Sequence, residues 1–330
     1  MKILIELPSW LGDAAMATPA IEHILEHFNN AEISLVGSFS STELLKNHPK
    51  VTEVKILDKK YLSLYRIAKN LGNFDNYFSF RSSIRSKIFQ LFILSNHKYQ
   101  FNKNKYQNLH QVEKYNNFIN DSLKINFKPG KLLINQATKP TKKNPTPIVG
   151  INPGASYGSS KQWYPEKFAE VAIELSSQYE ILIFGGLDEK NIASDIENIL
   201  INKGVLNYKN IAGKTTITEL VECISKLDLF ISGDSGPMHI AASFQVPTVA
   251  IFGPTRDNET SQWMNQKSII VKKHLDCQPC MKRNCPLKHN NCMKLIKVEE
   301  VLSRARSEGY KPMTLFSIDK GLKKIHIYLE

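Results

Sequence analysis

Two polar corners lie near opposite ends of the chain, and each follows an apolar run directly. Asp13 comes shortly after Ile3–Ile5, and the segment Asp234–His239 comes after Leu229–Ile231. A strand, a Gly-Pro corner and a helix start would expose backbone N–H groups and the positive end of a helix dipole to an anion. The second corner therefore predicts a phosphate site, and the first predicts a carboxylate facing a cleft. An ordinary helix cap is the plainer alternative for either acid.

A third segment, Asn152–Pro165, adds groups suited to a diphosphate. It holds two glycines, three serines and Lys161, so backbone N–H groups and a point charge lie together after a predicted strand. Combined with the Asp234 corner, the segment predicts a nucleotide-diphosphate cleft. The chain has no Asp-x-Asp pair for a divalent cation and no GxGxxG fingerprint, so neither metal-assisted transfer nor hydride transfer is indicated.

Four cysteines cluster late in the chain. Cys277-x2-Cys280-x4-Cys285-x6-Cys292 encloses His289 in its last interval. Four thiolates at such spacing could hold zinc or an iron-sulfur centre, but the second pair is wider than in a zinc ribbon. We favour free thiols in an ordered loop and expect no metal.

Composition indicates a soluble protein with anionic partners. Lys and Arg outnumber Asp and Glu by 43 to 31 in 330 residues, giving a formal charge of +12. The basic residues are spread through both halves, which weakens a nucleic-acid interpretation. No run approaches the ~18 apolar residues of a spanning helix, and the chain opens on a strand without a secretory signal.

Short apolar runs alternate with amphipathic stretches, which indicates an α/β protein built of βαβ units. We expect strands at Ile3–Ile5, Ile33–Val36, Val51–Ile56, Tyr77–Phe80, Ile148–Ile151, Ile181–Phe184, Tyr208–Ile211, Leu229–Ile231 and Thr248–Phe252. The polar, proline-containing stretch 136–147 reads as a linker. It divides the chain into domains 1–140 and 141–330, with the residues after Gly309 free to pack back on the first domain.

Several motifs together resemble a known family. Segments Ser9–Ile21, Asn152–Glu170, Asp234–Ala242 and Phe252–Thr255, with the late cysteines, look like the ADP-heptose:lipopolysaccharide heptosyltransferases, glycosyltransferase family 9, and most like the heptosyltransferase II branch. The resemblance implies a GT-B architecture: two Rossmann-like, doubly wound parallel-sheet domains that face each other across a cleft. It also implies inverting transfer of L-glycero-D-manno-heptose from ADP-heptose to the first heptose of the inner core.

The resemblance assigns roles to particular positions. It implies that Asp13 is the general base and that Lys161 binds the diphosphate. The implied donor-binding residues are Ser156, Tyr157, Glu189, Ala212, Gly213, Lys214, Thr215, Asp234, Ser235, Gly236, Pro237 and His239.

The acceptor carries phosphates and acidic sugars, so its pocket should be cationic. We expect Arg81, Arg85 and Lys87, which follow the strand Tyr77–Phe80, to bind such groups. The full set of expected acceptor residues is Ser9, Trp10, Gly12, Arg81, Arg85 and Lys87. A solvated helix start is the alternative for the three basic residues, and packing is the alternative for Trp10.

The expected partners are ADP-heptose and a heptosyl-Kdo-lipid A acceptor, with no required cofactor and no nucleic acid. We expect a cytoplasmic monomer that contacts the inner membrane transiently through weak electrostatic attachment. Three alternatives stay open: heptosyltransferase I or III with another acceptor, a basic nucleic-acid-binding protein with a zinc module, and a non-catalytic sugar-nucleotide sensor.

Overall fold

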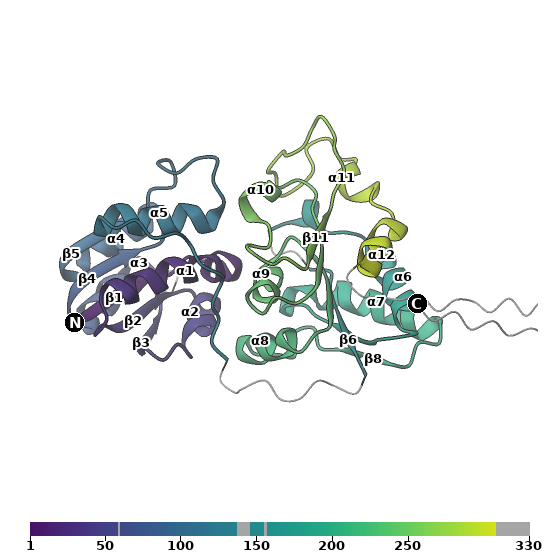
Figure 1. The fold of residues 1–330 in the computed structure, drawn as a ribbon, viewed down its shortest axis with the longest axis horizontal. Coiled ribbons are helices and arrows are strands. Elements are labelled where there is room, and N and C mark those ends of the chain that lie inside the picture. Colours follow the sequence, from purple (N-terminus) through teal and green to yellow (C-terminus); the bar gives the residue numbers. More distant parts are fainter. Residues whose placement is uncertain (59, 137–145, 155–156, 308–330) are drawn as a thin grey trace, which may run out of the picture.

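The computed structural model describes residues 1–58, 60–136, 146–154 and 157–307. These form two α/β halves that lie side by side (Figure 1). Each half is built on one parallel sheet, and helices cover both faces of it.

The N-terminal half contains a five-stranded sheet in the order β3-β2-β1-β4-β5. Its strands are β1 Lys2–Glu6, β2 Glu32–Gly37, β3 Val51–Ile56, β4 Asn73–Ser79 and β5 Leu94–Gln100, all paired in parallel. Helices α1 Leu11–His27, α2 Phe39–Leu45 and α5 Gln111–Leu123 share a core with Ile3 and Ile5. Helices α3 Tyr61–Leu71 and α4 Ile84–Phe92 share a core with Leu4, so alternate residues of β1 serve opposite faces.

The C-terminal half contains a six-stranded sheet in the order β11-β10-β9-β6-β7-β8. Its strands are β6 Ile148–Asn152, β7 Glu180–Ile183, β8 Tyr208–Asn210, β9 Leu229–Gly233, β10 Thr248–Ile251 and β11 Ser268–Val271. Its helices are α6 Pro165–Leu175, α7 Lys190–Asn202, α8 Ile217–Ser225, α9 Gly236–Ser243, α10 Asp257–Thr260, α11 Asn291–Lys294 and α12 Val298–Ser307. Two 3-10 turns, Ser159–Lys161 and Leu187–Glu189, lie in its loops.

The two halves meet through helices. In Figure 1, α1 lies against α9 and α2 against α8, and one apolar cluster includes residues of all four helices. Polar contacts join α5, its N-cap and the loop that follows it to α10 and the segment after α10. His110 Nε2 lies 3.1 Å from the Ser261 carbonyl, Trp263 Nε1 donates to the Gly130 carbonyl at 2.9 Å, and Lys114 pairs with Glu259.

The structure confirms the predicted α/β class and the nine predicted strands, with bounds shifted by a few residues. Strands β5 and β11 were not predicted. In β5, Ser95, Asn96, His97 and Lys98 interrupt any apolar run, and the strand lies at an edge exposed to water. The predicted domain boundary lies in residues 137–145, and the tail after Gly309 lies in 308–330; both are outside the described residues. Among the residues described, no helix is long and apolar enough to cross a bilayer.

Candidate active site

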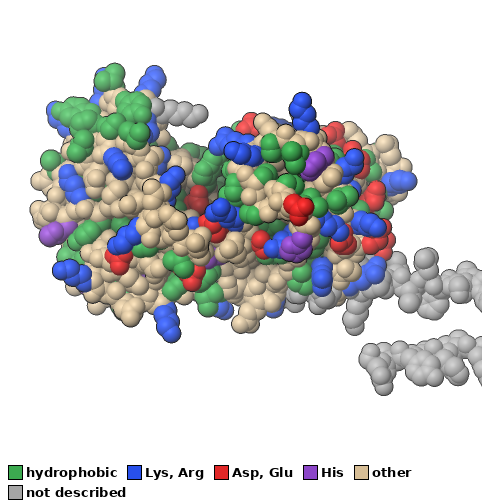
Figure 2. Space-filling model, turned by 90° about the horizontal axis from the view of Figure 1, so that it is seen from above, with side chains coloured by type: hydrophobic (Ala, Val, Ile, Leu, Met, Phe, Trp, Pro, Cys, Tyr) green, Lys and Arg blue, Asp and Glu red, His purple; other side chains and the backbone are tan. Residues whose placement is uncertain are grey.

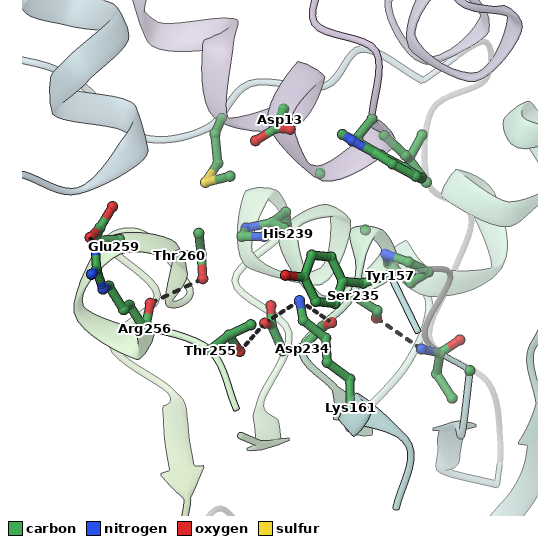
Figure 3. A pocket seen from close by; sticks show the side chains of 18 of the residues that line it. Asp13, Tyr157, Lys161, Asp234, Ser235, His239, Thr255, Arg256, Glu259 and Thr260 are labelled. Atoms are coloured by element: carbon green, nitrogen blue, oxygen red, sulfur yellow. Dashed lines mark hydrogen bonds and ion pairs between the residues drawn. The ribbon is translucent and has the colours of Figure 1, made fainter. Parts of the chain in front are cut away.

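A cavity of about 340 Å³ lies between α1 and the carboxyl edge of the C-terminal sheet. Its size is in the usual range for a small-molecule site. In Figure 3, Asp13 on α1 lies opposite His239, Asp234 and Lys161 of the other half. The lining residues are Trp10, Leu11, Gly12, Asp13, Met16, Asn152, Gly154, Tyr157, Lys161, Glu189, Asp234, Ser235, Gly236, Pro237, His239, Thr255, Arg256, Glu259, Thr260 and Met281.

Two helices begin at this cavity. The N-cap of α1 is Trp10 and that of α9 is Ser235, and neither side chain caps its helix by a hydrogen bond. Asp13 lies in the first turn of α1 and Asp234 precedes the α9 cap, so neither acid is the helix cap that the plainer interpretation required. The positive ends of both helix dipoles therefore favour an anion in the cavity.

Gly12 allows the two helix starts to approach closely. A Cβ atom on Gly12 would lie 2.7 Å from His239 Cδ2 and 3.4 Å from Gly236 Cα. Real carbon atoms do not pack at the first distance, so any side chain at position 12 would push α1 away from α9. The absence of a side chain at position 12 keeps Asp13 close to the C-terminal half.

The Asp13 carboxyl is half-buried, and burial raises its pKa to about 6. The Lys161 ammonium opposes this rise, and the Asp234 carboxylate adds to it. Asp13 is therefore mostly ionised at neutral pH, yet its pKa is close enough to neutrality for it to accept a proton efficiently.

Lys161 is held by an acid of its own domain. Its Nζ atom lies 2.5 Å from Asp234 Oδ2, and the Thr255 hydroxyl donates to the same oxygen at 2.6 Å. The Lys161 ammonium also lies 4.7 Å from the centroid of the Tyr157 ring. Both members of the pair are largely buried, so the contact with Asp234 fixes the Lys161 side chain at the cavity wall.

His239 presents a neutral ring to the cavity. Burial lowers its pKa to about 4, although the Asp234 carboxylate opposes the shift. Its buried Nδ1 atom has no hydrogen-bond partner among the described residues.

The cysteine-rich segment supports the loop that carries Lys161. The Tyr157 hydroxyl donates to the Met281 carbonyl at 2.7 Å, and the Ser160 amide donates to the Arg283 carbonyl at 3.1 Å. These contacts join residues more than 120 positions apart. Packing of the cysteine-rich segment therefore helps to set the position of Lys161.

The four cysteines themselves line one small cavity of about 20 Å³ beside His289. The pKa of the Cys292 thiol is raised to about 11, chiefly by burial, whereas the Asn290 amide lowers the pKa of the Cys285 thiol. All five cysteines are free thiols, and the described part of the chain contains no group of three or more His, Cys, Asp or Glu residues placed to hold a metal ion.

Most predicted donor residues meet at the cavity, and four do not. Ala212, Gly213, Lys214 and Thr215 do not line it, and Ser156 lies outside the described residues. Glu189 lines the cavity, where its carboxylate accepts the Gly186 amide at 2.7 Å. A Cβ on Gly154 would overlap that carboxylate at 2.1–2.3 Å, so only glycine allows this approach.

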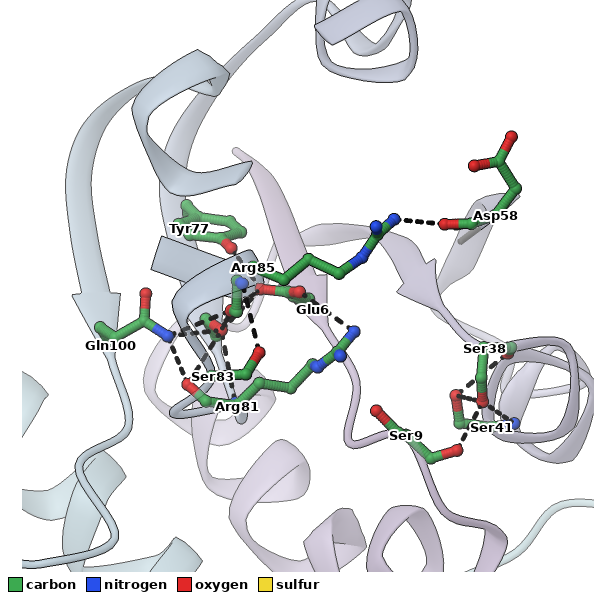
Figure 4. A network of polar contacts seen from close by, with 12 residues as sticks. Glu6, Ser9, Ser38, Ser41, Asp58, Tyr77, Arg81, Ser83, Arg85 and Gln100 are labelled. Atoms are coloured by element: carbon green, nitrogen blue, oxygen red, sulfur yellow. Dashed lines mark hydrogen bonds and ion pairs between the residues drawn. The ribbon is translucent and has the colours of Figure 1, made fainter. Parts of the chain in front are cut away.

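The predicted acceptor residues divide in the same way. Trp10 and Gly12 line the cavity, whereas Ser9, Arg81, Arg85 and Lys87 do not. In the network of Figure 4, Arg81 lies 3.5 Å from the buried Glu6 carboxylate, and Arg85 donates to the Asp58 carbonyl. Lys87 lines a separate hollow of about 410 Å³ near the ends of β4 and β5. Their contacts with an acceptor stay a prediction.

Thr255, Arg256, Glu259, Thr260 and Met281 line the cavity but were not predicted as site residues. Thr255 ends a segment already quoted for its family resemblance, and it follows β10 at the carboxyl edge of the sheet, where ligands of α/β proteins bind. That position was the available signal. Arg256, Glu259, Thr260 and Met281 carried no comparable signal.

Similarity to known proteins shows the family of this chain. The model of glycosyltransferase family 9 (heptosyltransferase) matches residues 79–291. The chain belongs to this family. It is 45% identical over 316 residues to lipooligosaccharide heptosyltransferase 2 of Campylobacter jejuni serotype O:2, covering 93% of this chain and 98% of that relative.

Solved heptosyltransferases share the fold. E. coli ADP-heptose lps heptosyltransferase II superposes with a TM-score of 0.76 at 21% identity, covering 93% of this chain and 98% of that one. E. coli heptosyltransferase WaaC with ADP superposes with a TM-score of 0.72 at 13% identity, covering 93% of this chain and all of the other. The two parallel-sheet halves thus have the GT-B arrangement that the sequence predicted. Membership of the family makes the chain a glycosyltransferase.

Proposed function

We propose that this family 9 enzyme transfers L-glycero-D-manno-heptose from ADP-heptose to the first heptose of the lipooligosaccharide or lipopolysaccharide inner core, with inversion. The 45% identity to a lipooligosaccharide heptosyltransferase 2 over nearly the whole chain supports this choice of acceptor over those of heptosyltransferases I and III. The observation that carries the proposal is the shared cavity: Asp13 lines it from one half and Lys161 from the other.

The reaction is a single displacement. The Asp13 carboxylate accepts the proton of the attacking acceptor hydroxyl, and the hydroxyl oxygen bonds to the anomeric carbon as the bond to ADP breaks. Lys161 and the start of α9 stabilise the negative charge that grows on the leaving diphosphate. The sugar lies in the cavity between the two halves.

Binding roles follow the same division. Asp234–Pro237, His239, Tyr157 and Glu189 line the donor side, and Trp10 and Gly12 line the acceptor side. No metal is needed in this scheme, because Lys161 and the start of α9 meet the charge of the leaving group. The enzyme acts as a monomer at the cytoplasmic face of the inner membrane.

The test combines purified enzyme and ADP-heptose with core acceptors that carry no heptose, one heptose or two. ADP release and product mass are followed for each acceptor. We expect one added heptose on the acceptor with a single heptose, and little ADP release with the others. Transfer to the heptose-free acceptor would instead assign heptosyltransferase I, and ADP release without any product would contradict transfer.

A further inference from the structure

Helices α3 and α4 present apolar side chains to water. On α3, Leu62, Tyr65, Arg66 and Lys69 follow the i, i+3, i+4, i+7 spacing of one helix face. Leu62 is 81% exposed and Tyr65 is 53% exposed. Leucine at such exposure gains nothing from the fold, so the face is available to a partner.

The neighbouring helix continues this surface. On α4, Ile84, Lys87 and Leu91 share one face, and Ile84 and Leu91 are 75% and 76% exposed. The Tyr65 ring contacts the Phe92 ring, with centroids 5.5 Å apart, so the two helices form one continuous surface. We call the exposed sides of α3 and α4 the apolar-basic face. In Figure 2, hydrophobic side chains gather on a projecting margin of the N-terminal half, with Lys and Arg side chains among them.

The charged side chains carried by α3 and α4 have one sign, and the adjoining acid Asp58 precedes α3 and accepts the Ser63 hydroxyl. Neither α3 nor α4 contains an Asp or Glu residue. Arg66, Lys69 and Lys87 form no ion pair within the described part of the chain. Apolar side chains mixed with unpaired cations are typical of surfaces that bind anionic membranes. A second copy of this chain would place like charges together, which disfavours self-association.

The location suits a lipid-linked substrate. Helices α3 and α4 cover the sheet face opposite α1, so the C-terminal half does not cover them. Both helices begin after the carboxyl ends of their strands, at the same sheet edge from which α1 starts and where Trp10 and Asp13 lie. A bilayer on this face would therefore lie beside the acceptor end of the cavity.

We infer that the apolar-basic face docks on an anionic lipid surface, with Leu62, Ile84 and Leu91 inserted among the headgroups and Arg66, Lys69 and Lys87 against lipid phosphates. The choice of lipid over another partner rests in part on the proposed lipid-linked acceptor. Contact with a membrane is then hydrophobic as well as electrostatic, so high salt weakens it without abolishing it.

The test is co-sedimentation of the full chain with vesicles of phosphatidylglycerol and phosphatidylethanolamine that contain no acceptor. We expect Leu62→Ser/Leu91→Ser to lower the partition coefficient about tenfold or more. The matched control, Leu187→Ser/Leu206→Ser, alters two leucines of the C-terminal half that are 72% and 91% exposed. It should bind as the wild type does.

A second pair of substitutions tests the charges. Arg66→Gln/Lys69→Gln should lower the vesicle partition coefficient about tenfold, and the control Lys203→Gln/Lys209→Gln should leave it unchanged.

A deacylated, water-soluble acceptor separates this inference from the proposed function. Leu62→Ser/Leu91→Ser should transfer heptose to that acceptor at the wild-type rate and to vesicle-bound acceptor more slowly. Equal vesicle binding by this variant and its control would overturn the inference, whatever the transfer assay shows. A wild-type chain that sediments as a dimer through this face and ignores vesicles would overturn it too.

Discussion

At the scale of single residues, the ionised Asp13 carboxylate destabilises the folded protein, and its proposed role as the general base explains why an acid is present there. Burial raises its pKa to about 6 from 3.8, so its ionised form is less stable in the folded protein than in the unfolded chain. A protein selected for stability alone would not keep a carboxylate there. A base that must receive a proton near neutral pH benefits from the same shift.

We predict that Asp13→Asn stabilises the protein above about pH 6. The folded pKa lies above the unfolded one, so the wild-type penalty is complete above pH 6 and disappears as the pH falls toward 4. Denaturant unfolding at pH 8 should show a gain of about 2–3 kcal/mol, shrinking at pH 4.5. The control Asp195→Asn alters an exposed acid of α7 and should show no such trend. Loss of stability in Asp13→Asn at pH 8 would contradict the assigned environment.

The Lys161–Asp234 pair gives a second prediction. Lys161→Met leaves the buried Asp234 carboxylate without its cation and should cost about 3 kcal/mol of unfolding free energy. Adding Asp234→Asn should restore most of that stability, since the amide oxygen can still accept from Thr255. Both the single and the double variant should bind ADP more weakly than the wild type, as measured by calorimetry. Tight ADP binding by the double variant would remove Lys161 from the diphosphate site.

Residue types at strand ends allowed most of the donor side to be predicted from sequence. The Asp234 corner directly follows the apolar strand β9, Lys161 lies in the loop after β6, and parallel strands bring such ends to one edge. The sequence could not reveal that Arg81 contacts the Glu6 carboxylate and Arg85 the Asp58 carbonyl, because these partners lie 75 and 27 positions away.

At the scale of elements, the contact between α1 and α9 sets the distance between Asp13 and the cavity wall of the C-terminal half. Gly12 lies at this contact, 2.7 Å from His239 if a Cβ is added. Sequence predicts Gly12 only as an acceptor residue, because the helix that faces it lies more than 220 residues later. Long-range packing of this kind leaves no local pattern to recognise.

We expect Gly12→Ala to reduce turnover at least tenfold, because α1 must shift and carry Asp13 away from the donor side. Gly130→Ala is the control, since nothing lies within 4 Å of a Cβ at that position. Steady-state transfer rates and thermal unfolding of both variants provide the comparison. If Gly12→Ala kept the wild-type rate, the close approach of α1 and α9 would not matter for transfer.

At the scale of the whole molecule, contacts between the two halves shape the shared cavity. Lys114 of α5 pairs with Glu259 of α10, and the latter lines the cavity. The partners are 145 residues apart, in different sheets, so neither spacing nor composition could pair them. The alternation of strands and helices was sufficient to predict two parallel sheets, but not how one sits against the other.

The central claim is that a base from one half and a leaving-group site from the other act in a single cavity. Its most direct test measures heptose transfer and ADP affinity together in Asp13→Asn. We predict that turnover falls about 10²–10⁴-fold while the dissociation constant of ADP stays close to the wild-type value. Turnover near the wild-type rate would contradict the account.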